Sequence, residues 1–138
     1  MQRLLLVLLG LGASVAITRH ALSTDLLDQY LPLKAAPEHH KTLLENGFVL
    51  VLDVSIPPGA TVPAHLHPWP AVFITLEPAH LIFRNLSGDV VREVHPPAEP
   101  FGGPKVEWRE PDTEPASVTN VGTNQQRALR VELKFLAR

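Results

Sequence analysis

The sequence predicts an all-β fold, a sandwich or barrel of about seven or eight short strands. Three observations support it: apolar residues alternate with polar ones along several segments, turn signals separate these segments, and 14 prolines and 8 glycines punctuate 138 residues. A hydrophobic content of 45% is sufficient for one core, and the length corresponds to one domain.

The N-terminal 16 residues are typical of a secretory signal. One positive charge at Arg3 precedes an apolar run from Leu4 to Ile17, and small residues at Ser14 and Ala16 suit cleavage after residue 16. We expect a periplasmic or secreted protein; an uncleaved N-terminal membrane anchor is the alternative.

Residues 17–44 are expected to form a helical and irregular segment. Apolar residues from Leu22 to Leu31 have helical spacing, and Pro32 is expected to end that helix. The neighbouring His39 and His40 lie in a polar stretch, and we expect both to be solvated.

Strands dominate the barrel expected over residues 45–138. Residues 48–56 alternate with period two and are apolar on both faces at first, which indicates a central strand. Further strands are expected at 72–76, 80–86, 90–95 and 106–108, with a hairpin turn at Ser87-Gly88-Asp89 and a proline-rich loop at 96–104.

The last strand has the clearest alternation in the sequence. Leu129, Val131, Leu133 and Phe135 fall on one face, while the charged residues Arg130, Glu132 and Lys134 fall on the other. We expect a half-buried strand with its leucine and valine side chains in the core.

Two histidines stand out as candidate metal ligands. His65 and His67 are two residues apart, so on a strand both side chains project from the same face and both imidazoles could bind one divalent ion. Gly59 suits a tight turn that leads into this strand. The alternative is a pair of histidines at the rim of the fold with no ion.

The segment from Gly59 to His67 resembles the first half of the first conserved motif of the cupin superfamily. Asn120-Val121-Gly122 and the strand after it resemble the end of the second motif. The resemblance covers roughly residues 45–135 and implies a jelly-roll β-barrel with a metal site at its mouth, holding Fe, Zn or Mn.

The chain departs from the cupin motifs at two of the four usual ligands. Ala71 and Val72 occupy the positions where the first motif has glutamate, Ala116 the position where the second has histidine, and Thr113 a glycine position. Glu114 is two residues before Ala116, so we expect its carboxylate to serve as a substitute ligand beside the histidines. A degenerate site without any metal is the alternative.

Other residues are candidates for a ligand pocket or a third imidazole. Trp69, beside His67, is expected to flank a ligand pocket or to pack over the barrel mouth. Phe73 is expected to line the pocket or to join the core. Trp108 is expected in the core. His80 and His95 lie on strands that are predicted to pair, and we expect them to be exposed or hydrogen-bonded.

Composition excludes several classes of function. Without cysteine there is no disulfide, thiolate ligand or cysteine nucleophile. A net charge of −2 gives no indication of a nucleic-acid or membrane-surface partner.

The sequence therefore favours an exported cupin-like protein that binds a small molecule in its barrel with little or no catalysis. The alternative is a metal-dependent enzyme of dioxygenase or isomerase type that uses His65, His67 and Glu114. A homodimer, with residues 48–56 covered by a second copy, is a further expectation.

Overall fold

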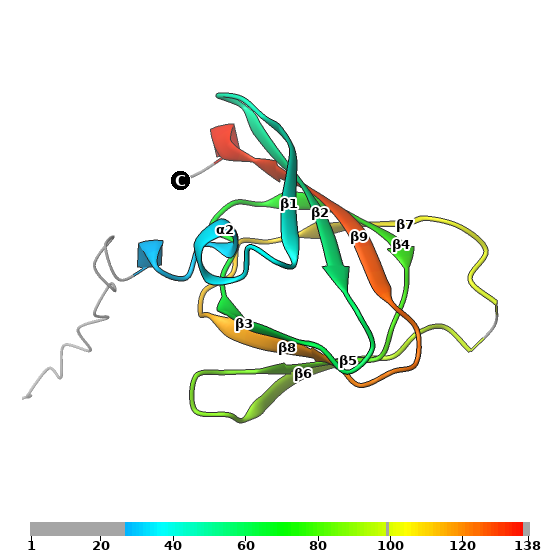
Figure 1. Cartoon of the computed structure of the whole chain (residues 1–138). Helices are drawn as coiled ribbons and strands as arrows, with labels where there is room; N and C mark the ends of the chain where they lie inside the picture. The colour runs from blue at the N-terminus through cyan, green and yellow to red at the C-terminus, as the bar shows by residue number, and fades with distance from the viewer. Residues whose placement is uncertain (1–26, 99, 137–138) are drawn as a thin grey trace, which may run out of the picture.

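The computed structural model describes residues 27–98 and 100–136, so the predicted signal segment lies outside the described residues. A short helix precedes nine strands and a final 3-10 turn (Figure 1). In chain order these are α2 (Pro32–Ala35), β1 (His40–Glu45), β2 (Val49–Ile56), β3 (Thr61–His65), β4 (Ala71–Glu77), β5 (Leu81–Arg84), β6 (Val90–Val94), β7 (Lys105–Arg109), β8 (Ala116–Asn120), β9 (Gln126–Leu133) and η1 (Lys134–Leu136). Within these residues, no helix has the length and apolar character needed to cross a membrane.

The strands form two antiparallel sheets that pack as a jelly-roll-like β-sandwich. The five-stranded sheet has the order β1-β2-β9-β4-β7 and the four-stranded sheet has the order β3-β8-β5-β6. Figure 1 shows the two sheets facing each other, with long loops joining them. The all-β prediction is confirmed; the two sheets are separate and do not form one closed barrel.

Strand β2 is an inner strand, as its apolar composition predicted. It lies between β1 and β9, and its burial alternates strictly, with Leu50, Leu52, Val54 and Ile56 facing inward. The outer-face side chains of β2 are partly buried, and the exposed large apolar side chains near this strand include Leu43, Leu44 and Phe48.

The closing strand β9 is turned over relative to the sequence-based expectation. Its buried residues are Gln126, Ala128, Arg130 and Glu132, whereas Leu129, Val131 and Leu133 are only partly buried on the outer face. The prediction of a leucine-valine core face was therefore wrong. The inner face of this sheet borders a polar site, where the buried side chains of Arg130 and Glu132 form an ion pair.

The N-terminal segment also differs from expectation. Residues 27–28 of the expected helix are helical and a turn follows them. Leu31 has an extended backbone, and Pro32 begins the separate short helix α2, consistent with the preference of proline for the first helical turn. Residues 22–26 of the expected helix lie outside the described residues. Strand β1 starts at His40 and pairs with β2, so the sheet begins before the boundary expected at residue 45.

One turn and one buried amide hold the loops that connect the sheets. Gly59 has a φ of 77°, which favours glycine, and its N–H donates to the Asn120 carbonyl over 2.8 Å. The fully buried Asn120 side chain donates to the carbonyls of Ile56 and Asn124 and accepts from the Gly122 N–H. These contacts fix the approach to strand β3, which carries the first candidate ligand.

Candidate metal centre

Three buried histidines converge at one end of the sandwich. His65 and His67 are 8% and 7% exposed, and His40, the first residue of β1, is 3% exposed. The ring centroids of His40 are 4.7 Å from His65 and 5.3 Å from His67, and those of His65 and His67 are 5.1 Å apart. His40 belongs to the five-stranded sheet and His65 to the four-stranded sheet, so the cluster connects the two sheets.

The expectation that His40 is solvated was wrong. Its neighbour His39 donates from Nδ1 to the Ser55 carbonyl and is only partly buried, so two adjacent histidines have different environments. His40 was missed because its inward orientation depends on the pairing of β1 with β2, where it lies opposite Val54. No periodicity in residues 36–42 indicated this pairing.

Hydrogen bonds fix the tautomers of all three rings. The Nδ1 atom of His40 lies 3.0 Å from the Ala36 carbonyl oxygen, and that of His65 lies 2.8 Å from the Pro63 carbonyl oxygen. Because a carbonyl oxygen only accepts, Nδ1 carries the proton in both rings. The His67 Nδ1 lies 2.5 Å from Glu132 Oε1 and donates to it in the same way. Each ring therefore keeps the Nε2 lone pair for an ion.

The histidine cluster fits a divalent metal ion. One ligand atom from each ring lies within 4.8 Å of the other two. Two nitrogens bound to one ion at about 2.1 Å are at most about 4.2 Å apart, so small ring movements would complete the site. The Nδ1 bonds supply the outer shell that metal-ligating histidines normally have.

Burial keeps the three imidazoles neutral. Desolvation, reinforced by His65, lowers the pKa of His40 to about 3. Desolvation also lowers the pKa of His65 and lowers that of His67 well below its usual value, the latter with help from Arg130. Neutral imidazole is the form that binds metals.

We expect the metal-free protein to lose stability as the pH falls from about 6 to about 4. The unfolded state takes up protons on His40, His65 and His67 before the folded state does, since the folded pKa values are lowered. For His40 this contribution to stability is complete above pH 6.5 and is lost as the pH falls to about 3, by about 1.4 kcal/mol per pH unit while the unfolded state alone takes up the proton. Urea unfolding with a chelator, measured across this range, tests it.

The variant His40→Ala should show a shallower pH dependence than the natural chain, because one of the three protons is no longer involved. Glu132 acts in the opposite direction: burial raises its pKa, so the folded protein takes up that proton early. An equal pH dependence in both proteins would contradict the assignment of His40 as a buried neutral imidazole.

Glu132 and Arg130 form a buried hydrogen-bonded network that orients the His67 ring. Glu132 is fully buried, and its Oε1 accepts from His67 Nδ1 and from Arg130 Nε, the latter over 3.0 Å. Burial lowers the pKa of Arg130, which Glu132 opposes. Among the described residues, Arg130 Nη2 and Glu132 Oε2 are buried without a hydrogen-bond partner. The alternating pattern of β9 places both residues on one face of the strand, but their charges led us to predict that this face is exposed to solvent.

The structure does not bring Glu114 to the histidines. Glu114 is exposed and borders a shallow second depression, and it is not among the residues whose ligand atoms converge. Ala116, the position where the cupin motif has histidine, pairs directly with His65 across β3 and β8. The geometry therefore replaces Glu114 by His40 as the third candidate ligand.

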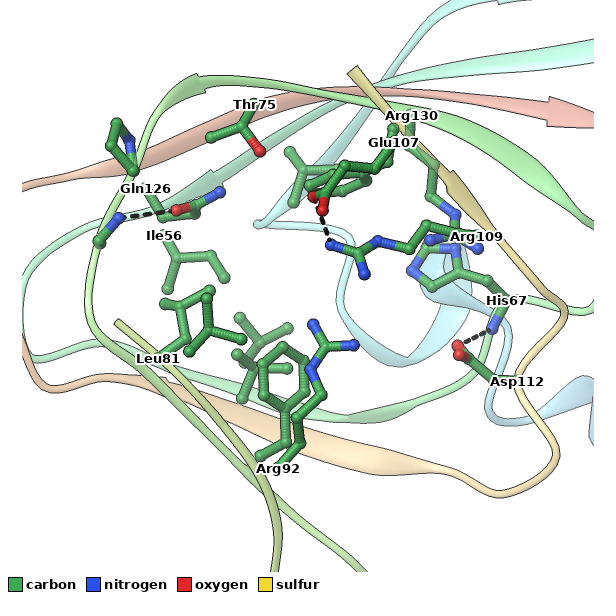
Figure 2. Close-up of a pocket in the computed structure, with 18 of the residues that line it drawn as sticks. Ile56, His67, Thr75, Leu81, Arg92, Glu107, Arg109, Asp112, Gln126 and Arg130 are labelled. Atoms are coloured by element: carbon green, nitrogen blue, oxygen red, sulfur yellow. Dashed lines mark hydrogen bonds and ion pairs between the residues drawn. The ribbon is translucent and has the colours of Figure 1, made fainter. Parts of the chain in front are cut away.

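A cavity of about 740 Å³ lies between the sheets and is bordered by all three histidines. Phe73 borders this cavity, while Trp69 packs against the cluster of Leu50, Leu52 and Val54. Trp108, expected in the core, is 50% exposed and contributes to the cavity wall. Figure 2 shows Ile56 and Leu81 at the end of the cavity away from His67.

Comparison with solved structures decides the fold. A cupin domain from Bordetella pertussis Tohama I is similar over 69% of this chain and 91% of its own, at 20% identity and a TM-score of 0.54. The chain has the cupin fold. A double-stranded β-helix protein from Klebsiella pneumoniae matches over 81% of this chain and 90% of its own, at 16% identity and a TM-score of 0.48. No family model and no curated protein matches the sequence.

This cupin fold carries a second, exposed group of potential ligands. His80 Nε2 and His95 Nε2 lie 2.6 Å and 3.4 Å from Glu93 Oε1, and the two imidazole centroids are 4.3 Å apart. Hydrogen bonding to His80 lowers the pKa of Glu93. This group matches the expectation of hydrogen-bonded, solvent-accessible histidines and lies outside the buried cluster.

Proposed function

We propose that this chain is an exported member of the cupin superfamily that holds a divalent metal ion and binds a small molecule beside it. The observation that supports the metal site is the convergence of His40, His65 and His67, with each Nδ1 hydrogen-bonded to an acceptor. Fe, Zn and Mn are all compatible with imidazole ligands.

The proposal of small-molecule binding draws on the cavity next to the histidines. Ligand sites are typically concave, largely apolar and equipped with a few polar groups. Here an apolar end with Ile56, Val62 and Leu81 is continuous with the polar end that contains the histidines. A metal with three protein ligands keeps open positions toward such a cavity.

Catalysis is the second candidate function. It is favoured by the three-histidine set, because structural metal sites are usually closed by four protein ligands. A metal ion held here would act as a Lewis acid toward an oxygen atom of a bound molecule. The chain itself would contribute Glu132, which orients His67, and the cavity beside the histidines.

Metal content after mild purification tests the proposal. We expect close to one metal ion per chain in elemental analysis, and its loss in the double variant His65→Ala/His67→Ala. The variant His80→Ala/His95→Ala is the control, since it removes only the exposed group. Retention of the metal in the first variant and loss in the second would refute the buried centre.

Binding and catalysis are separated by analysing any molecule that co-purifies. Native mass spectrometry identifies its mass on the protein, and the released molecule is then returned to metal-loaded protein. An unchanged molecule indicates binding alone; conversion that depends on His65 indicates an enzyme. Mass spectrometry of the chain also tests export, because cleavage after Ala16 leaves a mature chain that starts at Ile17.

A further inference from the structure

Three arginines from three strands border the histidine end of the cavity. Arg92 comes from β6, Arg109 from β7 and Arg130 from β9, so both sheets contribute. Figure 2 shows the guanidinium groups of Arg92 and Arg109 pointing toward one another across the cavity. Burial and the neighbouring Arg109 both lower the pKa of Arg92, as expected for two cations that face each other.

Two of these arginines are held in place by aromatic rings. Arg92 Cζ lies 4.1 Å from the centre of the Phe83 ring, and Arg109 Cζ lies 5.2 Å from that of Phe73. Such stacking restricts the long side chains before any ligand arrives. The guanidinium donors are therefore positioned on the cavity wall, where Arg92 is exposed to solvent and Arg109 is partly buried.

The nearby carboxylates are already engaged. Glu107 accepts from Arg109 over 3.0 Å and also pairs with Lys105, and Asp112 accepts from the His67 backbone N–H over 2.8 Å. Arg130, which is 6% exposed, uses Nε for Glu132 and keeps Nη2 without a partner among the described residues. A buried unpaired donor of this kind is costly unless a ligand or water accepts from it.

We propose that the cavity selects an organic anion, with its negatively charged group between Arg92, Arg109 and Arg130 and its apolar body against Ile56, Val62 and Leu81. Arginine forks recognise carboxylate and similar planar or oxygen-rich anions with paired hydrogen bonds. The apolar end of the cavity, which also contains Val118, excludes small inorganic anions as the best occupants. This inference deepens the proposed function by naming the ligand class of the same cavity.

Two dyes with the same aromatic body test the charge preference. Anilinonaphthalenesulfonate carries a negative charge, and N-phenylnaphthylamine is its neutral counterpart. In the full chain with chelator present, we expect the anionic dye to bind at least about tenfold more tightly than the neutral one, since hydrogen bonds to charged groups typically contribute this much or more. Displacement of the anionic dye by naphthoate, but not by naphthamide, would extend the preference to carboxylates.

Variants assign the effect to the arginines. Arg92→Gln and Arg109→Gln should each weaken binding of the anionic dye about tenfold and leave the neutral dye within about twofold. Arg84→Gln is the control, since Arg84 lies on the adjacent strand β5 and is exposed, and its side chain donates to the Gly88 carbonyl. Thermal unfolding of each variant checks that the fold is retained.

The outcomes separate this inference from the proposed function. Equal affinity for the two dyes, or equal loss of both in the arginine variants, would overturn the anion preference while leaving a cavity that binds small molecules. Absence of binding for both dyes would overturn both ideas about the ligand. The proposed metal centre is tested independently of the ligand, because metal content is measured without any dye.

Discussion

Replacing His40 with alanine is expected to lower metal affinity by at least about 100-fold. Loss of an outer-shell partner alone typically costs about 10–100-fold, so the loss of one of three ligands has a larger effect. His40 is also the candidate ligand that connects strand β1 to the site, through a ring that lies 4.7 Å from His65. Competition titration against a chromogenic chelator, with Zn²⁺ as the probe, measures the change.

The neighbouring histidine provides a matched control. His39→Ala removes a ring that bonds the Ser55 carbonyl and takes no part in the cluster. We expect its metal affinity to remain within about twofold of the natural chain, because the ligand set is intact. Equal losses in the two variants would indicate a general effect on β1, and no loss in His40→Ala would exclude His40 as a ligand.

Removing the carboxylate of Glu132 is expected to have the second largest effect, on stability as well as on metal binding. Glu132→Ala leaves Arg130 buried without its ion pair, which typically costs about 3–5 kcal/mol in the free energy of unfolding. It also frees His67 Nδ1, so we expect metal affinity to fall about 10–100-fold. Urea unfolding with chelator and Zn²⁺ titration measure the two effects separately.

A conservative variant and an exposed ion pair serve as controls. Glu132→Gln keeps an acceptor for His67 but removes the charge beside Arg130, so we expect a smaller loss of metal affinity than with alanine. Glu45→Ala breaks an exposed pair with Lys134 and should cost at most about 1 kcal/mol. If Glu132→Ala were as mild as Glu45→Ala, the buried network would not be structurally important.

The sequence predicted what short-range patterns determine. Period-two alternation located β2, the Ser87-Gly88-Asp89 turn located the β5–β6 hairpin, and Gly59 marked the turn before β3. The rings of His65 and His67 are neighbours as expected, 5.1 Å apart, but β3 ends at His65, so His67 lies after the strand and not on the same strand face.

What the sequence did not predict depends on pairing between distant segments. His40 becomes buried only through the register of β1 with β2, which its local sequence does not encode. In β9, hydrophobicity indicated that the leucine face is internal, but Arg130 and Glu132 face inward because they neutralise one another next to a polar cavity. Glu114 was expected near the histidines because it is two residues before Ala116, but it lies before β8 begins and is exposed.

The position of His40 on an edge strand links ion binding to local unfolding. In the part of the chain that the structure describes, β1 pairs with β2 alone, so in the metal-free protein we expect it to separate from the sheet at lower cost than the inner strands. An ion held by His40, His65 and His67 would join this edge to the opposite sheet. Hydrogen–deuterium exchange should then slow at the amides of β1 when metal is added, with little change in the amides shared by β2 and β9.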